Sequence, residues 1–465
     1  MSEAPAGVFI DESAIASTLE RHRLADAACV REVLGKARTL NGLEADDIAA
    51  LMTISDPGLL GELFATAQEI KAAIYGRRLV IFAPLYVSNL CGNECTYCAF
   101  RARNTELERR ALSQEEIARE ARILIDQGHK RVLLVAGESY PREGFSYVLE
   151  SIDTIYSVTH DAGEVRRINV NVAPLTLDEF RALQDRKIGT YQLFQETYHR
   201  GTYTSVHVAG KKADYDWRIT AMDRAMTAGI DDVGIGVLFG LFDWRFELLA
   251  LMQHIRHLER QFGVGPHTLS VPRMEPATGS DVATHPPQPV SDIDFRKIVG
   301  ILRLAVPYTG IIMSTRESAH IRRETFALGV SQISAGSRTN PGGYAETERE
   351  DASQFCLGDH RLLDEVVRDV ASLGYIPSFC TACYRLGRTG RDFMDLAKPG
   401  LIKEHCDPNA LATFVEYLED YASAETRAAG EACVRHILET MVPETQAMSA
   451  RMIERVRAGT RDVYC

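Results

Sequence analysis

Short apolar runs alternate with longer amphipathic stretches through the middle of this chain. The runs are rich in β-branched residues, and the stretches between them have helical periodicity, which is the pattern of βα units around a parallel sheet. We count eight such runs, at Leu79–Tyr86, Arg131–Ala136, Ile168–Ala173, Thr190–Gln195, Val233–Phe239, His267–Pro272, Gly310–Thr315 and Val330–Ala335. Eight parallel strands with intervening helices close most naturally into an α/β (β/α)8 TIM barrel, although a partly open barrel would give the same pattern.

Helix-start signals agree with this alternation. Three capping-box spacings follow loops, at Ser113 with Glu116, Thr176 with Glu179 and Ser291 with Asp294. We predict a helical N-terminal extension over residues 1–75, the barrel over 76–345 and a mostly helical C-terminal region over 346–465. Within that region Asp407 and Pro408 are expected to be the N-cap and first residue of a helix that runs through Tyr421.

Composition and charge exclude several classes of protein. The 465 residues are 45% hydrophobic and 25% charged, as in ordinary globular proteins, and the net charge of -12 argues against nucleic acid or a membrane surface as partner. The N-terminus has acidic residues and no apolar signal region, so we expect a soluble, cytoplasmic protein. Six of the ten cysteines gather in two short patterns, which is typical of thiolates that hold metal rather than of a disulfide framework.

The first pattern, CX3CX2C, consists of Cys91, Cys95 and Cys98 and follows the first predicted strand directly. One interpretation is three buried or zinc-bound cysteines, but structural zinc takes four ligands and no fourth lies nearby in the sequence. The other is a 4Fe-4S cluster held at three corners, which leaves one iron open as a binding site.

With an aromatic residue, Tyr97, before the last cysteine, this motif resembles that of the radical S-adenosylmethionine (radical SAM) enzymes. The resemblance implies that the open iron chelates the amino and carboxylate groups of SAM, and that an added electron cleaves SAM to a 5′-deoxyadenosyl radical. The loop would lie at the carboxyl end of the first strand, where barrel enzymes keep their chemistry.

The same resemblance implies further SAM contacts. Gly137 and Glu138 match the glycine and acid that receive the SAM amino group, and Arg218 matches the basic residue for the carboxylate, unless it is an exposed helix arginine. Ile235 and Leu238 would lie under the adenine or belong to the barrel core. Tyr97 would offer backbone atoms to the adenine rim.

The second pattern, CX2CX22C, consists of Cys380, Cys383 and Cys406. By spacing alone it is either a zinc site completed by His405 or Cys356, or a second iron-sulfur cluster with an open corner. The remaining cysteines, Cys29, Cys356, Cys433 and Cys465, have no cluster spacing, and we expect them to be packing residues or surface thiols.

With both patterns, nearly the whole chain resembles the HydG family, the tyrosine lyases that mature the active-site cluster (H-cluster) of FeFe hydrogenase. The matching stretches are CGNECTYCAFRARN, LVAGE, FQETYH, DVGIGVLFGL, PHTLSVPR, STRE, ISAGSRTNPGGY and CTACYRLGRTGRDFMDLAKPG. The related 2-iminoacetate synthase (ThiH) of thiazole biosynthesis and the tryptophan lyase of indolic-acid synthesis share the barrel motifs and lack the C-terminal cysteines.

This resemblance implies an activity and its cofactors. The adenosyl radical abstracts hydrogen from the amino group of tyrosine, and Cα–Cβ cleavage gives p-cresol and dehydroglycine. Dehydroglycine becomes carbon monoxide and cyanide, captured as an Fe(CO)2(CN) unit on an additional iron with a bound cysteine at the second of two 4Fe-4S clusters. The implied partners are SAM, L-tyrosine, an electron donor such as a flavodoxin or ferredoxin, and other hydrogenase maturases.

Site residues follow from the matched stretches. His267 is the expected protein ligand of the additional iron, with His254 and His257 as alternatives. Arg316, Ser334 and Arg338 are expected at the tyrosine carboxylate or phenol, or else in structural ion pairs at the barrel rim. Gln195, Glu196 and His199 are assigned to the positioning of SAM or substrate.

Two alternative functions stay open from the sequence. One is a tyrosine lyase that feeds thiazole biosynthesis and stops at dehydroglycine. The other is a metal carrier or scaffold without turnover.

Overall fold

Eight parallel strands form a closed barrel in the computed structural model, which describes residues 9–24, 26–160, 163–346, 352–398 and 402–465. The strands pair in the order β1, β3, β6, β7, β9, β10, β11 and β12, and β12 returns to β1. Their bounds are β1 Arg78–Ser88, β3 Arg131–Ala136, β6 Arg167–Asn171, β7 Tyr191–Glu196, β9 Val233–Val237, β10 Thr268–Ser270, β11 Gly310–Met313 and β12 Gln332–Ser334. The predicted α/β barrel is confirmed, and each observed strand overlaps one predicted run.

The barrel sheet has a ninth strand, which was not predicted. β13 (Ile376–Ser378) pairs in parallel with the first residues of β1, Arg78 to Val80. The strand is short and contains Pro377, which removes a backbone donor, so no alternating pattern marks it in the sequence. The C-terminal region is therefore joined to the barrel by backbone pairing.

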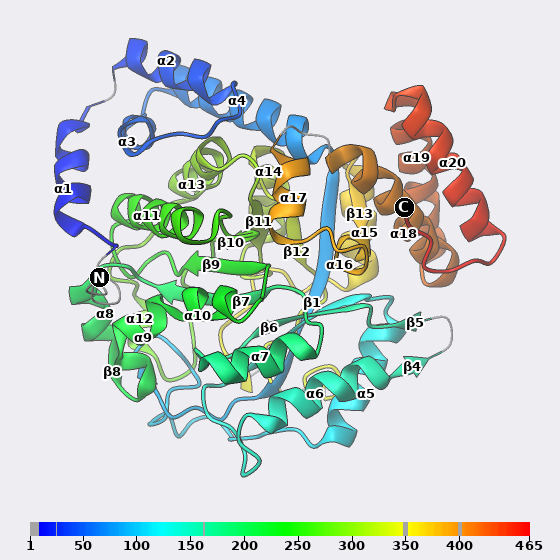
Figure 1. Ribbon diagram of the computed structural model, residues 1–465, viewed down its shortest axis with the longest axis horizontal. Coiled ribbons are helices and arrows are strands. Elements are labelled where there is room, and N and C mark those ends of the chain that lie inside the picture. Colours follow the sequence, from blue (N-terminus) through cyan, green and yellow to red (C-terminus); the bar gives the residue numbers. More distant parts are fainter. Residues whose placement is uncertain (1–8, 25, 161–162, 347–351, 399–401) are drawn as a thin grey trace.

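Helices cover the outside of the barrel between consecutive strands (Figure 1). They are α5 Gln114–Asp126, α6 Ser146–Ser157, α7 Leu177–Asp185, α8 Arg200–Val206, α9 Tyr215–Ile219, α10 Ala221–Thr227, α11 Trp244–Phe262, α12 Asp281–Thr284, α13 Asp292–Ala305 and α14 Ala319–Leu328. Short pairings add β2 (Glu94–Cys95) with β8 (His207–Ala209), and β4 (Thr159–His160) with β5 (Gly163–Glu164), and a 3-10 turn spans Lys211–Ala213.

The predicted helix starts are observed. Ser113 and Thr176 each cap a helix reciprocally with the glutamate three residues later, and the Ser291 side chain accepts from the backbone N–H of Asp294. Each cap satisfies backbone donors that the first helical turn leaves without partners.

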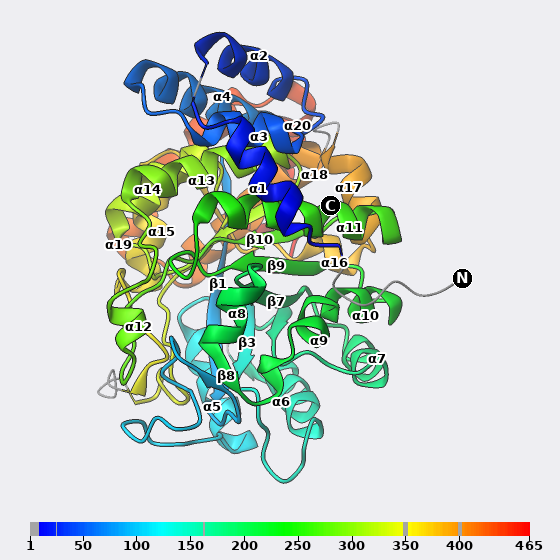
Figure 2. The same ribbon diagram turned by 90° about the vertical axis from the view of Figure 1, so that its left-hand side faces the viewer.

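The N-terminal extension is helical, as predicted, over α1 Glu12–Arg21, α2 Ala27–Ala37, α3 Ala45–Met52 and α4 Pro57–Tyr75. The last of these, α4, packs on α13 and α14, and both views of the ribbon place α2 to α4 along one side of the barrel (Figures 1 and 2). The extension thus buries an apolar face of the barrel's own helices.

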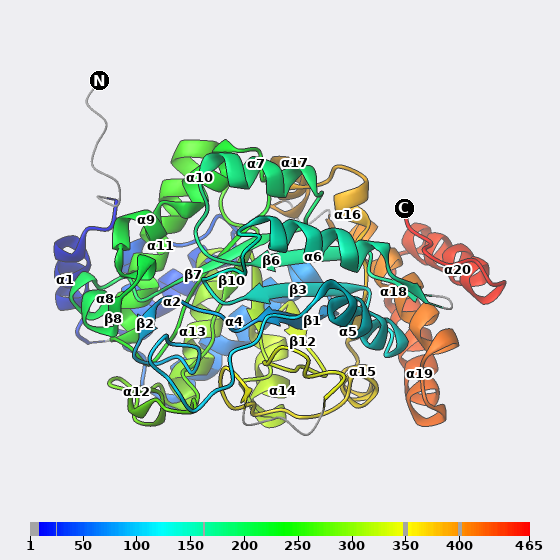
Figure 3. The ribbon, with the colours of Figure 1, turned by 90° about the horizontal axis from the view of Figure 1, so that it is seen from below.

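The C-terminal region is mostly helical, with α15 Leu363–Ser372, α16 Ala382–Arg385, α17 Gly390–Ala397, α18 Ile402–Asp420, α19 Ala424–Thr440 and α20 Pro443–Arg457. Its last helices lie at the end of the molecule opposite α1 (Figure 3). The predicted helix start at Asp407 and Pro408 is wrong, because α18 begins at Ile402 and carries Pro408 inside it. Ile402 and Cys406 pack into an apolar cluster with Phe393, which holds the turn before the proline in place.

No helix within the described residues has the length and apolar character needed to cross a membrane.

Candidate functional site

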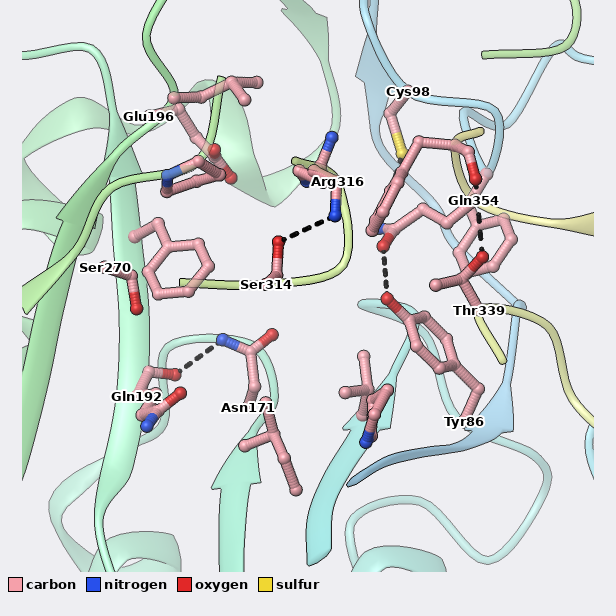
Figure 4. Close-up of a pocket in the computed structure, with 18 of the residues that line it drawn as sticks. Tyr86, Cys98, Asn171, Gln192, Glu196, Ser270, Ser314, Arg316, Thr339 and Gln354 are labelled. Atoms are coloured by element: carbon pink, nitrogen blue, oxygen red, sulfur yellow. Dashed lines mark hydrogen bonds between the residues drawn. The ribbon is translucent and has the colours of Figure 1, made fainter. Parts of the chain in front are cut away.

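A cavity lies at the carboxyl ends of the barrel strands, and the first cysteine trio lines it (Figure 4). Cys91, Cys95 and Cys98 all belong to the loop that follows β1. Cys95 is buried, whereas Cys91 and Cys98 are half-buried against the same apolar cluster. The structure thus brings the trio together at the end of the barrel that the sequence predicted.

Hydrogen bonds hold this loop on both sides. Gly137 N donates to Ser88 O at 2.8 Å, which ties the start of the loop to the end of β3. On the other side β2 pairs with β8, and Thr96 N donates to Val206 O at 2.9 Å. The cysteines are therefore presented by a braced segment rather than by a free loop.

The donor chemistry of the trio fits an iron-sulfur cluster. Burial raises the pKa of all three thiols, that of Cys98 to about 11, so the metal-free thiols hold their protons at neutral pH. Iron binding replaces those protons, and three cysteines supply three of the four corners of a 4Fe-4S cluster.

A network of charged side chains lies beside the trio. Arg218 donates to Glu138 Oε1 at 2.8 Å, and Asn93 Nδ2 donates to Glu138 Oε2 at 2.8 Å. Lys212 pairs with Glu196 at 2.7 Å. Burial raises the pKa of Glu138, but Arg218 and Lys212 together outweigh it and hold that pKa below its usual range. The carboxylate is therefore ionised and suited to a cationic amino group.

The expected SAM contacts divide into two groups. Tyr97, Gly137, Glu138, Arg218 and Leu238 line the cavity, whereas Ile235 is not among the lining residues and packs in the barrel core. Arg218 is 4% exposed, so the interpretation of this residue as an exposed helix arginine is wrong.

Arg316 and Ser334 line the far side of the same cavity. The Arg316 guanidinium lies 3.2 Å from the ring centroid of Phe355 and forms no ion pair with an acidic side chain in the described part of the chain. Beside it, Tyr86 OH donates to Gln354 Oε1 at 2.7 Å, and Gln354 Nε2 lies 3.8 Å from Cys98 Sγ (Figure 4). Glu196 and Glu275 act on this half-buried cation only from a distance, so a direct anionic partner is missing and the site is suited to an anionic ligand group.

Three other expected residues lie away from the cavity lining. Gln195 is buried and does not line the first cavity, at a point where the register of β7 against β9 shifts between Phe194 and Glu196. His199 caps α8 and stacks on Phe242. Arg338 lines a neighbouring cavity with Thr278. A direct role for these three residues stays a prediction.

A second cavity lies at the opposite end of the barrel, and Cys380, Cys383, Cys406 and His267 all line it. His267 precedes β10 directly, and Phe393 packs on its ring with centroids 4.5 Å apart. Burial lowers the pKa of His267, which favours the neutral imidazole that binds metal.

The second trio also fits a cluster. Burial raises the pKa of Cys380 to about 11, and contact with Cys406 together with burial raises the pKa of Cys383. Within the described residues, no three His, Cys, Asp or Glu side chains converge closely enough to hold a single metal ion. Three cysteines around one cavity suit the separate corners of a cluster better than one zinc ion.

The alternative ligands lie elsewhere. His254 bonds to Tyr198 OH at 2.8 Å, and His257 pairs with Asp223 at 2.6 Å, both on the outer helix α11. Cys356 is exposed, beside the cavity that Arg338 lines, and His405 is not among the residues that line the second cavity. The structure therefore places His267, and none of these four, with the second trio.

Several residues of both cavities were not predicted. Asn93 and Lys212 lie in the first, and Arg78, Arg131 and Asp232 lie in the second. Asn93 lies inside the cysteine motif, which was a usable signal. The other four come from strand starts and turns with no local pattern, so only the tertiary structure reveals them.

The two cavities share strands. Along β1, Val80 faces the second cavity and Phe82 the first, and along β12 Gln332 and Ser334 divide in the same way. Two residues along a strand advance by about 7 Å. Neighbouring inward-facing residues of one strand therefore line different cavities.

Comparisons with known proteins show the family of the chain. Residues 85–252 match the model of the radical SAM superfamily, and residues 270–376 match the biotin and thiamin synthesis associated domain. 2-Iminoacetate synthase of Escherichia coli (strain K12) is 33% identical over 360 residues, which are 76% of this chain and 92% of that protein.

Two solved structures cover almost the whole chain. A crystal structure of HydG, a maturase of the FeFe hydrogenase, is 46% identical, with a TM-score of 0.95 and coverage of 98% of this chain and 100% of that one. The FeFe-hydrogenase maturase HydG from Carboxydothermus hydrogenoformans is 41% identical, with a TM-score of 0.82 and coverage of 96% and 99%.

Proposed function

The chain belongs to the radical SAM enzymes, in the tyrosine lyase family that includes HydG and 2-iminoacetate synthase, and from this premise we propose the reaction that it catalyses. It cleaves the Cα–Cβ bond of L-tyrosine to p-cresol and dehydroglycine. It then forms carbon monoxide and cyanide from dehydroglycine on iron, as an Fe(CO)2(CN) unit for assembly of the FeFe-hydrogenase H-cluster. An electron donor such as a flavodoxin or ferredoxin, and other maturases, are its proposed partners.

The first cavity holds the lyase chemistry. Cys91, Cys95 and Cys98 would hold a 4Fe-4S cluster, which with SAM supplies the adenosyl radical when both are bound. Glu138 is ionised and accepts the amino group of SAM, while Arg218, held by Glu138, lies ready for a carboxylate.

Tyrosine is oriented by the far side of this cavity. Arg316 offers a positive charge to the carboxylate of the substrate, in surroundings that hold little water. The Phe355 ring stacks on its guanidinium and holds it in place. Ser334 lies close by, its hydroxyl accepting from Thr315 N at 3.1 Å. A clamped carboxylate directs the amino group toward the cluster end, as abstraction at nitrogen requires.

The second cavity handles the iron cargo. Cys380, Cys383 and Cys406 would hold the second cluster, and His267 binds the additional iron while leaving other positions for diatomic ligands and a bound cysteine. Imidazole binds ferrous iron in its neutral form. Burial lowers the pKa of His267, which favours this neutral form.

The observation that carries this proposal is the placement of two cysteine trios in two cavities, one at each end of one barrel. Polar residues such as Gln192, Ser270 and Gln332 face these cavities, where barrels usually place Val, Ile and Leu. A polar interior is suited to the transfer of a small polar fragment from the lyase site to the iron site without release to solvent.

The test is oxygen-free reconstitution of the protein with iron and sulfide, followed by SAM, tyrosine and a reductant. We expect p-cresol and 5′-deoxyadenosine, together with carbon monoxide and cyanide. Absence of p-cresol would overturn the lyase proposal.

The other outcomes separate the two alternatives. Formation of p-cresol without carbon monoxide or cyanide would favour a lyase of the thiazole pathway. Zinc in place of clusters, with no cleavage of SAM, would favour a metal carrier.

A further inference from the structure

We propose that Asp232 is a positioning residue for His267 at the second cavity. Its carboxylate accepts the Nδ1–H of the imidazole and so fixes the tautomer that presents Nε2 to the additional iron. This inference rests on the proposed function, because it concerns how the chain holds that iron.

The barrel brings these two residues together. Asp232 precedes β9 and His267 precedes β10, and the two strands pair in parallel with Thr268 opposite Gly234. His267 N donates to Val233 O at 2.8 Å, which sets the two strand starts in register. His267 Nδ1 lies 3.6 Å from Asp232 Oδ1, and both residues line the cavity with the cysteine trio.

His267 lacks a hydrogen-bond partner that Asp232 can supply. Nδ1 of His267 is buried and has no hydrogen-bond partner within the described residues. Asp232 is 3% exposed and forms no ion pair with an arginine or lysine in the described part of the chain. A shift of well under 1 Å would convert the 3.6 Å approach into a hydrogen bond that satisfies Nδ1.

The rest of the surroundings holds this geometry. Gly390 N donates to Asp232 Oδ1 at 2.9 Å, which fixes the carboxylate from the C-terminal region. Phe393, on the same short helix α17, packs on the His267 ring. The segment between Cys383 and Cys406 therefore aligns both the histidine and its carboxylate partner.

Elementary imidazole chemistry gives the consequence. A neutral imidazole carries one N–H, so a hydrogen bond from Nδ1 leaves Nε2 as the unprotonated, metal-binding nitrogen. Metal-binding histidines commonly donate their second nitrogen to a carboxylate, and loss of that partner costs about 10- to 100-fold in metal affinity.

The deciding variant is Asp232→Ala, because one oxygen, Asp232 Oδ1, both accepts from Gly390 N–H and faces His267 Nδ1. Without this acceptor the Nδ1–H tautomer loses its partner, so less of the imidazole has an unprotonated Nε2 for iron. The matched control is Asp231→Ala, since Asp231 is exposed and lies beside Thr389 outside the second cavity.

The experiment titrates ferrous iron into full-length protein that already holds its clusters, and measures the iron bound beyond them. We expect Asp232→Ala to bind this iron about 10- to 100-fold more weakly than wild type. Asp231→Ala should match wild type, and His267→Ala should lose the site. The rate of p-cresol formation, measured in parallel, reports that the barrel and the first cavity are intact.

The outcomes separate the inference from the function. Binding by Asp232→Ala within about twofold of wild type, with loss in His267→Ala, would overturn the role of Asp232 and leave the proposed function standing. A wild-type protein that forms p-cresol but binds no additional iron would overturn both the iron site and this inference.

A spectroscopic measurement on the wild-type protein needs no variant. Histidine labelled with nitrogen-15 at either Nδ1 or Nε2 distinguishes the bound nitrogen by its hyperfine coupling to the iron spin. We expect the stronger coupling from Nε2 of His267, and ligation through Nδ1 would refute the proposal.

Discussion

Arg316 is a half-buried cation that forms no ion pair with an acidic side chain in the described part of the chain, and it lines the same cavity as the first cysteine trio. Burial lowers the pKa of its guanidinium, which reflects the cost of holding a charge there. Phe355 stacks on it at 3.2 Å, and Ser334 lines the same cavity. The free energy lost by burying this charge is recovered when a substrate carboxylate pairs with it.

Substitution Arg316→Lys should therefore weaken tyrosine binding. A charge-assisted, bidentate contact contributes about 1.5–3 kcal/mol, so we expect KM for tyrosine to rise roughly 10- to 100-fold with a smaller change in kcat. Initial rates of p-cresol formation against tyrosine concentration measure this. Arg323→Lys is the control, because Arg323 lies on the outer helix α14 and pairs with Asp369. An unchanged KM for tyrosine in Arg316→Lys would contradict the assignment of Arg316 to the substrate carboxylate.

Glu247 is a buried carboxyl group that shapes the turn after β7. It accepts from the hydroxyl of Thr197 and from Tyr198 N at 2.8 Å, and burial raises its pKa to about 8. Because the folded pKa lies above the unfolded value of 4.5, the folded state holds the extra proton between these values. The contribution of Glu247 to the free energy of unfolding is therefore present at low pH and lost as pH rises through about 8.

Substitution Glu247→Gln removes this titration. We expect the variant to gain stability relative to wild type as pH rises, by about 2–3 kcal/mol between about pH 5.5 and pH 8. Denaturant unfolding under oxygen-free conditions at several pH values measures it. Glu69→Gln, at an exposed ion pair with Arg38, should show no such trend, and a parallel pH profile of Glu247→Gln and wild type would count against the buried titration.

At the scale of elements, the first cysteine loop depends on its approach to the end of β3. Ser139 N donates to Leu90 O at 3.1 Å, and a Cβ at Gly137 would lie 2.2 Å from that same Leu90 oxygen. No side chain fits between the two segments. The glycine is therefore required by close backbone packing, which places Glu138 next to the trio.

Substitution Gly137→Ala should push the cysteine loop away from β3. Overpacking of this kind costs about 1–3 kcal/mol, so we expect roughly a 10- to 100-fold loss of p-cresol formation and weaker SAM binding. Equilibrium binding of SAM to the cluster-loaded protein measures the second effect. Gly35→Ala, where no atom lies within 4 Å of the added methyl group, serves as control; full activity in Gly137→Ala would disprove the packing argument.

The attachment of the C-terminal region to the barrel is a second feature at the scale of elements. The C-terminal region is tied to the barrel by the pairing of β13 with β1 and by Gly390 N bound to Asp232. Both contacts lie at the end of the barrel where the second trio is found. Secondary structure outside the barrel therefore completes the second cavity.

At the scale of the whole molecule, one barrel carries a cysteine trio at each end. β1, β10 and β12 each contribute residues to both cavities or directly beside them, but no residue in the described part of the chain lines both cavities. This arrangement predicts that substitutions in the second cavity leave the formation of p-cresol intact.

The double substitution of Cys380 and Cys383 by alanine should separate the two reactions. We expect p-cresol formation to stay within about threefold of wild type, because no residue of the first cavity changes, whereas carbon monoxide is lost. Gas-phase detection of carbon monoxide alongside p-cresol measures both. Cys29→Ala, outside either trio, is the control; an equal loss of both products in the double variant would refute the division of labour.

Much of this protein follows from local sequence. The strands could be predicted because β-branched runs pack on a pleated sheet wherever they occur, and the first cysteine trio could be predicted because its three thiols follow one another closely on one loop. Ser113 and Thr176 cap their helices through neighbours only three residues away. In each case the interacting groups are close in the chain, so the pattern itself contains the physical cause.

Other features depended on contacts between distant residues and were decided only by the tertiary structure. The pairing of Asp232 with His267, the burial of Arg218 against Glu138 and the continuation of α18 through Pro408 all join segments that no local pattern connects. The physical reason is that hydrogen bonding and burial are set by the closed barrel, which brings these groups together after the strands have paired. The sequence by itself determined which chemistry the chain carries, and the barrel decided which side chains meet to perform it.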